Sequence, residues 1–175
     1  MALTREVERG TIENLMAMPA RPHEIMIGKI VPYIGFGFVQ IAVILVAARL
    51  LFAVPFEGPL TVLLSVTLLF IAANVTLGYT FSTLARSQMQ AMQMTVFFFL
   101  PSILLSGFMF PFRGMPVWAQ AIGEVIPLTH FLRVVRGVML KGSGFTDILP
   151  SVWPLALFWL AIATVALVRY RRTLD

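Results

Sequence analysis

Four stretches without Asp, Glu, Lys or Arg limit most strongly what this chain can form. They are 19, 28, 26 and 21 residues long and lie between Lys29 and Arg49, Glu57 and Arg86, Arg86 and Arg113, and Asp147 and Arg169. A membrane-spanning helix needs about 20 mostly apolar residues, so each stretch has room for one. We therefore predict four membrane-spanning helices, near residues 30–53, 60–84, 91–110 and 149–168.

The composition of the whole chain excludes an ordinary soluble fold and intrinsic disorder. Apolar residues make up 59% and charged residues only 12%, whereas soluble domains carry about 25% charged residues. Residues 60–73 are almost continuously apolar and do not alternate, which favours helices over the strands of a membrane barrel. We predict an all-α membrane protein embedded in the lipid bilayer, with a transmembrane domain over residues 30–175.

The first 29 residues differ from the rest and are predicted to form a cytoplasmic amphipathic segment. Between Thr4 and Met18, apolar residues recur at roughly helical spacing, while interspersed Arg and Glu residues mostly occupy the other face. Surface helices that bind lipid are usually rich in Lys and Arg. The mixed charge therefore suits a protein groove at least as well as a membrane surface, and both interpretations stay open.

The distribution of basic residues predicts the orientation of the chain. An even number of spans places both termini on one side, and that side would carry eight Lys or Arg against five on the other. The positive-inside rule then makes both termini cytoplasmic. The net charge of +5 is interpreted in the same way, as information on topology rather than as a nucleic-acid-binding surface.

The segment between the third and fourth spans, residues 111–148, is predicted to be a short re-entrant or interfacial helical hairpin. Two apolar stretches here are separated by Pro127, and each is too short to cross a bilayer. Thr129 is expected to cap the second helix. The ionisable residues of the segment serve either structural pairing or gating of an exit, and they are Glu124, His130, Arg133 and Arg136.

Polar residues inside the spans are few and mild. Asn74, Gly78 and Ser82 recur every four residues and so share one helix face. Small and polar residues on one face commonly allow close helix packing. The alternative is that this face lines a transport pathway.

Several kinds of site are not predicted. The sequence has no phosphate-binding loop of the G-x-x-x-x-G-K-[ST] type, so it cannot itself bind ATP in that way. There are no cysteines, and the two histidines lack partners at metal-ligand spacing. We expect no enzymatic activity, no metal and no cofactor.

Three motifs in this order resemble type-2 ABC exporter permeases. The first is Glu6–Leu15 followed by Pro19, which is similar to the family pattern E-x-E-[KR]-G-T-x-E-x-L-x-x-x-P. The second is Ser106–Pro111 with Met115 and Pro116 behind it, and the third is Pro127–Phe131 with Arg136–Gly142 behind it. Together they extend over nearly the whole chain.

The resemblance implies a permease subunit of an inner-membrane exporter that is driven by a separate ATPase subunit. In such permeases the first motif is a coupling segment, so the residues expected to dock on the ATPase are Glu6, Glu8, Gly10, Thr11, Glu13 and Leu15. The resemblance also implies a second permease half and an outer hairpin that closes the pathway, whose residues would be Glu124, Pro127, Thr129, His130, Arg133, Arg136 and Gly137.

Family members typically have six spans, and the four predicted here look like the last four. We therefore expect a truncated or split permease, or a fragment of one. A different class of function also fits the spans and the amphipathic segment: a multi-span membrane scaffold or assembly factor that transports nothing.

Overall fold

Four long helices form the body of the protein in a computed structural model, which describes residues 22–172. They are α3 (Pro22–Phe52), α4 (Leu60–Leu84), α5 (Gln88–Leu105) and α8 (Phe145–Arg172). All four contain an apolar stretch long enough to cross a membrane. No strand occurs in residues 22–172, so the prediction of an all-α protein with four membrane-length helices is confirmed.

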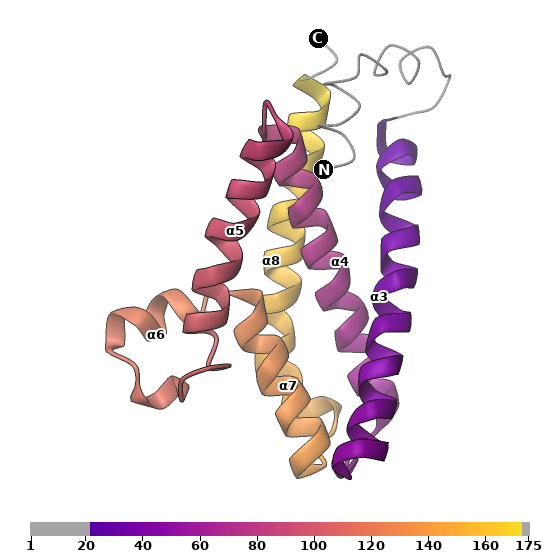
Figure 1. Cartoon of the computed structure of the whole chain (residues 1–175), viewed down its shortest axis with the longest axis vertical. Coiled ribbons are helices and arrows are strands. Elements are labelled where there is room, and N and C mark those ends of the chain that lie inside the picture. Colours follow the sequence, from indigo (N-terminus) through magenta and orange to yellow (C-terminus); the bar gives the residue numbers. More distant parts are fainter. Residues whose placement is uncertain (1–21, 173–175) are drawn as a thin grey trace.

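Three short helices connect α5 to α8. They are the 3₁₀ helix η1 (Phe112–Gly114), α6 (Val117–Gly123) and α7 (Pro127–Lys141). In Figure 1, α6 projects to the side of the bundle, whereas α7 lies against α8 at the end of the bundle farther from the α4–α5 turn. The start of α3 and the end of α8 lie at the same end as that turn.

The side chains of Ser87 and Gln90 fix the start of α5 at the short α4–α5 turn. The Ser87 hydroxyl accepts a hydrogen bond from the Gln90 amide at 3.2 Å, and the Gln90 side-chain oxygen accepts one from the Arg86 amide at 2.8 Å. This reciprocal arrangement is a variant of the capping box. It starts α5 at Gln88, before the predicted residue 91.

The end of the third helix and the start of the fourth differ from the predicted ends of the spans for local reasons. The third span ends at Leu105 rather than near residue 110, because Gly107 takes a left-handed conformation with φ of 83° and turns the chain. The fourth helix begins at Phe145 rather than near 149. The carboxylate of Asp147 accepts a hydrogen bond from the Gly144 amide at 2.9 Å, so this charged residue belongs to the first turn of the helix.

The buried core lies where α4, α7 and α8 meet. Its fully buried apolar side chains are Leu63 and Val66 of α4, Val134, Val138 and Met139 of α7, and Ile148 and Leu155 of α8. By contrast, no residue from 31 to 52 of α3 is buried, and α5 buries only Ala91 and Ser102. Helices α3 and α5 therefore leave most of their apolar surface available to lipid or to other membrane helices.

The loop between α3 and α4 is fixed to the last turn of α7. The Glu57 amide donates a hydrogen bond to the Met139 carbonyl at 3.3 Å. A Cβ atom added to Gly58 would lie 2.6 Å from the Val138 carbonyl oxygen, closer than real Cβ contacts allow. The close approach of two backbones at this point therefore requires glycine.

We predict that Gly58→Ala destabilises the protein by about 1–3 kcal/mol, because the added methyl group forces the loop away from α7. The matched control is Gly35→Ala, since a Cβ at Gly35 has no atom within 4 Å. Thermal unfolding in detergent should show a lower midpoint for Gly58→Ala and an unchanged or slightly higher one for Gly35→Ala. Equal midpoints for the two variants would show that the contact does not matter.

Candidate functional site

The residues predicted to dock on an ATPase lie outside the described part of the chain. They are Glu6, Glu8, Gly10, Thr11, Glu13 and Leu15. The residues predicted for the outer hairpin and for the α4 face lie within it, and they fall into two places: one face of α7 and a groove between α4 and α5.

The first turn of α7 bonds to the end of α6. The Thr129 hydroxyl donates to the Gly123 carbonyl at 2.6 Å, and the His130 Nε2 atom lies 2.7 Å from the Glu124 carbonyl oxygen. Both side chains are buried. The prediction that Thr129 caps its own helix is wrong: α7 starts with Pro127 in its first turn, where no amide hydrogen is needed, and the hydroxyl is used at the end of α6 instead.

The next turn of α7 adds a charged pair. Both terminal nitrogens of Arg133 donate to the carboxylate oxygens of Glu124, a bidentate geometry that is among the stronger forms of ion pair. The guanidinium also lies 4.7 Å from the centre of the Phe112 ring. The hydrogen bond from Arg133 is the main reason that the pKa of Glu124 lies below its ordinary value of 4.5, and partial burial opposes this shift.

One turn farther along, Arg136 reaches the end of α5. Its guanidinium donates to the Gly107 carbonyl at 2.9 Å. Four side chains on one face of α7 thus hold the connecting segment, and they belong to residues 129, 130, 133 and 136. Their contacts in that segment are Gly107, Phe112, Gly123 and Glu124. We call Glu124, Thr129, His130, Arg133 and Arg136 the hairpin clasp.

The other two predicted hairpin residues, Pro127 and Gly137, lie at the start of α7 and in its C-terminal hydrogen bonding. Pro127 is buried at the start of the helix. Gly137 accepts a backbone hydrogen bond from Ser143 at 3.1 Å, where the left-handed Gly142 ends the helix. Five of the seven residues predicted for the hairpin are therefore brought together in the clasp, and two are not.

The buried imidazole of His130 has one nitrogen without a partner. Among the described residues nothing bonds to its Nδ1 atom, whereas Nε2 faces the Glu124 carbonyl. Because a carbonyl oxygen can only accept, Nε2 is the donor in this contact. Within residues 22–172 no group of three potential metal ligands occurs.

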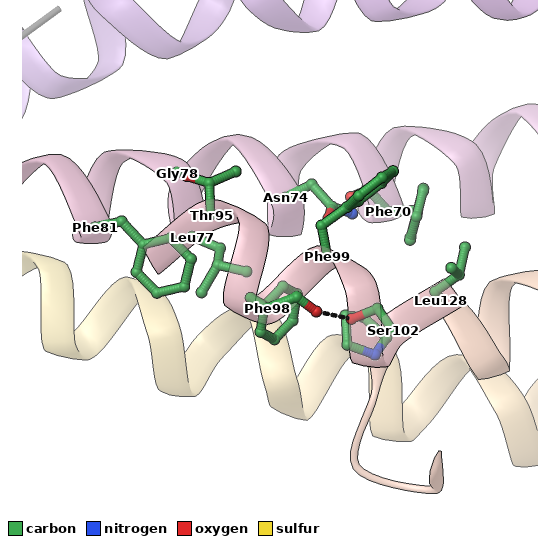
Figure 2. Close-up of a pocket in the computed structure, with 11 residues that line it drawn as sticks. Phe70, Asn74, Leu77, Gly78, Phe81, Thr95, Phe98, Phe99, Ser102 and Leu128 are labelled. Carbon is green, nitrogen blue, oxygen red and sulfur yellow. Dashed lines mark hydrogen bonds between the residues drawn. The ribbon is translucent and has the colours of Figure 1, made fainter. Parts of the chain in front are cut away.

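The second place is a groove between α4 and α5, closed at one end by the start of α7 (Figure 2). It has a volume of about 150 Å³. Asn74 and Gly78 line it, as the pathway interpretation of this helix face expected. Ser82 does not line it and is only 5% exposed. The remaining lining residues are Phe70, Leu77 and Phe81 of α4, Thr95, Phe98, Phe99 and Ser102 of α5, and Pro127 and Leu128 of α7.

Most of the groove residues were not predicted as a site. Those of α4 follow the helical spacing 70, 74, 77, 78 and 81, so a complete helical projection centred on Asn74 could have found them. The lining residues of α5, at 95, 98, 99 and 102, share one helix face in the same way, but only the tertiary arrangement brings that face and the start of α7 together with α4.

We predict that the hairpin clasp weakens in acid. The pKa of Glu124 is lowered on folding, so the stabilisation is present above pH 4.5 and is lost as the pH falls through the lower, folded-state pKa. Since Glu124 is 46% exposed, the ion pair contributes only about 0.2–1 kcal/mol. The unfolding midpoint, measured from pH 7 to pH 3, should fall less steeply in Glu124→Gln than in the unchanged protein.

Glu57→Gln is the control for this acid effect, because it removes one exposed carboxylate from a loop outside the clasp. It should keep the slope of the unchanged protein. Identical slopes in all three proteins would mean that the Glu124–Arg133 pair does not stabilise the fold.

Comparison with known proteins places this chain in a family. The profile of the family "ABC-2 type transporter" matches residues 1–140. The chain is 30% identical over 172 residues to "Probable multidrug ABC transporter permease YbhR" of Escherichia coli (strain K12), covering 98% of this chain and 47% of that protein. It is 33% identical over 177 residues to "Inner membrane transport permease YhhJ" of the same strain, covering 99% and 46%.

A more distant relative is "ABC transporter G family member 20" of Dictyostelium discoideum, 28% identical over 144 residues, which cover 82% of this chain and 20% of that protein. No solved structure gives a significant match. The chain spans about half the length of the two Escherichia coli relatives. Since the family profile matches 140 of its 175 residues, the chain belongs to the ABC-2 type transporter family.

Proposed function

We propose that this chain forms the membrane-spanning part of an ATP-driven exporter, with ATP hydrolysed by a separate subunit. The observation that carries the proposal is the family match over residues 1–140, together with relatives that are named as transport permeases over nearly the whole of this chain. Four membrane-length helices and the absence of a phosphate-binding loop from the sequence agree with a permease subunit that depends on a partner for energy.

The ATPase subunit docks on the segment before α3. The candidate contacts are Glu6, Glu8, Gly10, Thr11, Glu13 and Leu15, and the acidic side chains suit basic residues of the partner. This segment leads directly into α3. Closure of the ATPase dimer pushes it, and the push is transmitted to the membrane helices as a rigid-body movement.

Both ends of the chain face the cytoplasm, where the ATPase lies. In Figure 1 the start of α3, the end of α8 and the α4–α5 turn share one end of the bundle. The sequence carries most of its basic residues in these parts, including Arg86 in the turn. At the other end, Arg133 is paired with the Glu124 carboxylate, so it contributes less to the net charge of that face.

Transport uses the groove between α4 and α5 as part of the pathway, and the hairpin clasp closes its outer end. Pro127 and Leu128 contribute to the groove wall, and Thr129 and His130 follow directly in the clasp. Movement of α7 therefore changes the shape of the groove and the contacts of the hairpin clasp at the same time. The pathway is completed by a second permease half, which covers apolar surface that α3 and α5 leave exposed.

We predict that reversing two charges of the docking segment, Glu8→Arg with Glu13→Arg, releases the ATPase subunit. At least tenfold less ATPase should co-purify with the tagged permease from membranes, because two attractive pairs become repulsive. The control reversal Glu57→Arg changes a loop at the opposite end of the bundle and should leave co-purification unchanged. Normal co-purification of the double variant, at equal protein levels, would refute docking through this segment.

A further inference from the structure

The groove between α4 and α5 is lined by aromatic rings from both helices. Phe70 and Phe81 come from α4, and Phe98 and Phe99 come from α5 (Figure 2). The rings of Phe81 and Phe98 meet edge to face with centres 6.0 Å apart. The groove has a volume of about 150 Å³, which is the size of an apolar cavity that binds one benzene ring.

The hydroxyl hydrogens of the groove already have acceptors, so Thr95 and Ser102 have no hydrogen left to donate to a ligand. The Thr95 hydroxyl donates to the Ala91 carbonyl at 2.8 Å, and the Ser102 hydroxyl donates to the Phe98 carbonyl at 2.7 Å. No Asp, Glu, Lys or Arg is among the residues that line the groove. A charged molecule would therefore lose its hydration without a compensating partner.

Asn74 leaves one hydrogen-bonding atom available. Its side-chain nitrogen donates to the Phe70 carbonyl at 2.8 Å, which fixes the orientation of the amide because a carbonyl can only accept. Among the described residues nothing donates to the Asn74 Oδ1 atom. The side chain that lines the groove thus offers an acceptor and suits a molecule with one N–H or O–H group.

Gly78 keeps the groove open. A Cβ atom built on Gly78 would meet no atom within 4 Å, so a larger side chain at this position occupies the groove without striking the backbone. Gly35 of α3 is equally open but does not line the groove. The two glycines therefore form a matched pair for testing whether the groove is a binding site.

From this geometry we propose that the α4–α5 groove binds one uncharged aromatic ring that carries a single hydrogen-bond donor, such as a phenol. The ring packs among the phenylalanines, and its donor bonds to the Asn74 Oδ1 atom. Aromatic pairs gain from edge-to-face and offset stacking beyond the burial of area, which favours a ring over a lipid acyl chain. Only the identification of this ring as cargo rests on the proposed permease function.

The experiment is photolabelling of the purified chain in phosphatidylcholine vesicles without nucleotide. The probe is trifluoromethyl-phenyldiazirine, which is uncharged and has one ring, and adducts are located by mass spectrometry. Labelling of α4 and α5 at the groove should saturate and should be displaced by excess 4-ethylphenol. Gly78→Leu should reduce it at least tenfold, whereas Gly35→Leu should leave it unchanged.

A second variant tests the polar contact independently of the glycine. Asn74→Leu should weaken displacement by 4-ethylphenol at least fivefold but leave displacement by ethylbenzene unchanged. Labelling that rises without saturation and resists both competitors would show that lipid fills the groove and would overturn the proposal. Equal loss in Gly78→Leu and Gly35→Leu would overturn it as well. Because no ATPase is present, failure here is distinct from failure of docking.

Discussion

The packing of α7 between two membrane-length helices is the interaction on which the rest of the structure depends. With 15 residues it is too short to cross a bilayer, and its backbone ends need partners within the protein. Its apolar side meets this need by placing Val134 and Val138 in the core with α4 and α8, both almost completely buried. Its polar side is then left to face the connecting segment, where it forms the hairpin clasp.

The clasp and the groove are mechanically linked because they share the first turn of α7. Pro127 and Leu128 end the groove, and the next two residues hold the end of α6. Arg136 extends the link to the end of α5 through the Gly107 carbonyl. A shift of α7 against α5 would therefore change the groove and the connecting segment together, as the proposed gate requires.

The charge pattern predicted the membrane helices well because charged side chains are costly within a bilayer. Helix α4 has the predicted bounds of 60 and 84. The pattern failed where a charge or a polar group stabilises a helix end, as at Asp147, and where a glycine turns the chain, as at Gly107.

The sequence predicted the clasp residues as ionisable groups but did not predict their partners, since Arg136 bonds to a carbonyl 29 residues away. Ser82 shares the four-residue spacing of Asn74 but is buried and does not line the groove, which the spacing alone does not reveal.

Nucleotide-dependent access to the groove tests the central claim most directly. The natural chain has no cysteine, so a single Thr95→Cys substitution provides one reactive group, exposed on the groove wall. The measurement is the rate at which a membrane-impermeant thiol reagent, added from the extracytoplasmic side, modifies this cysteine in membranes that contain the ATPase partner. The account predicts a rate at least fivefold higher when ATP is trapped than when nucleotide is absent. Equal rates in the two states would contradict a pathway through this groove that is opened by ATP.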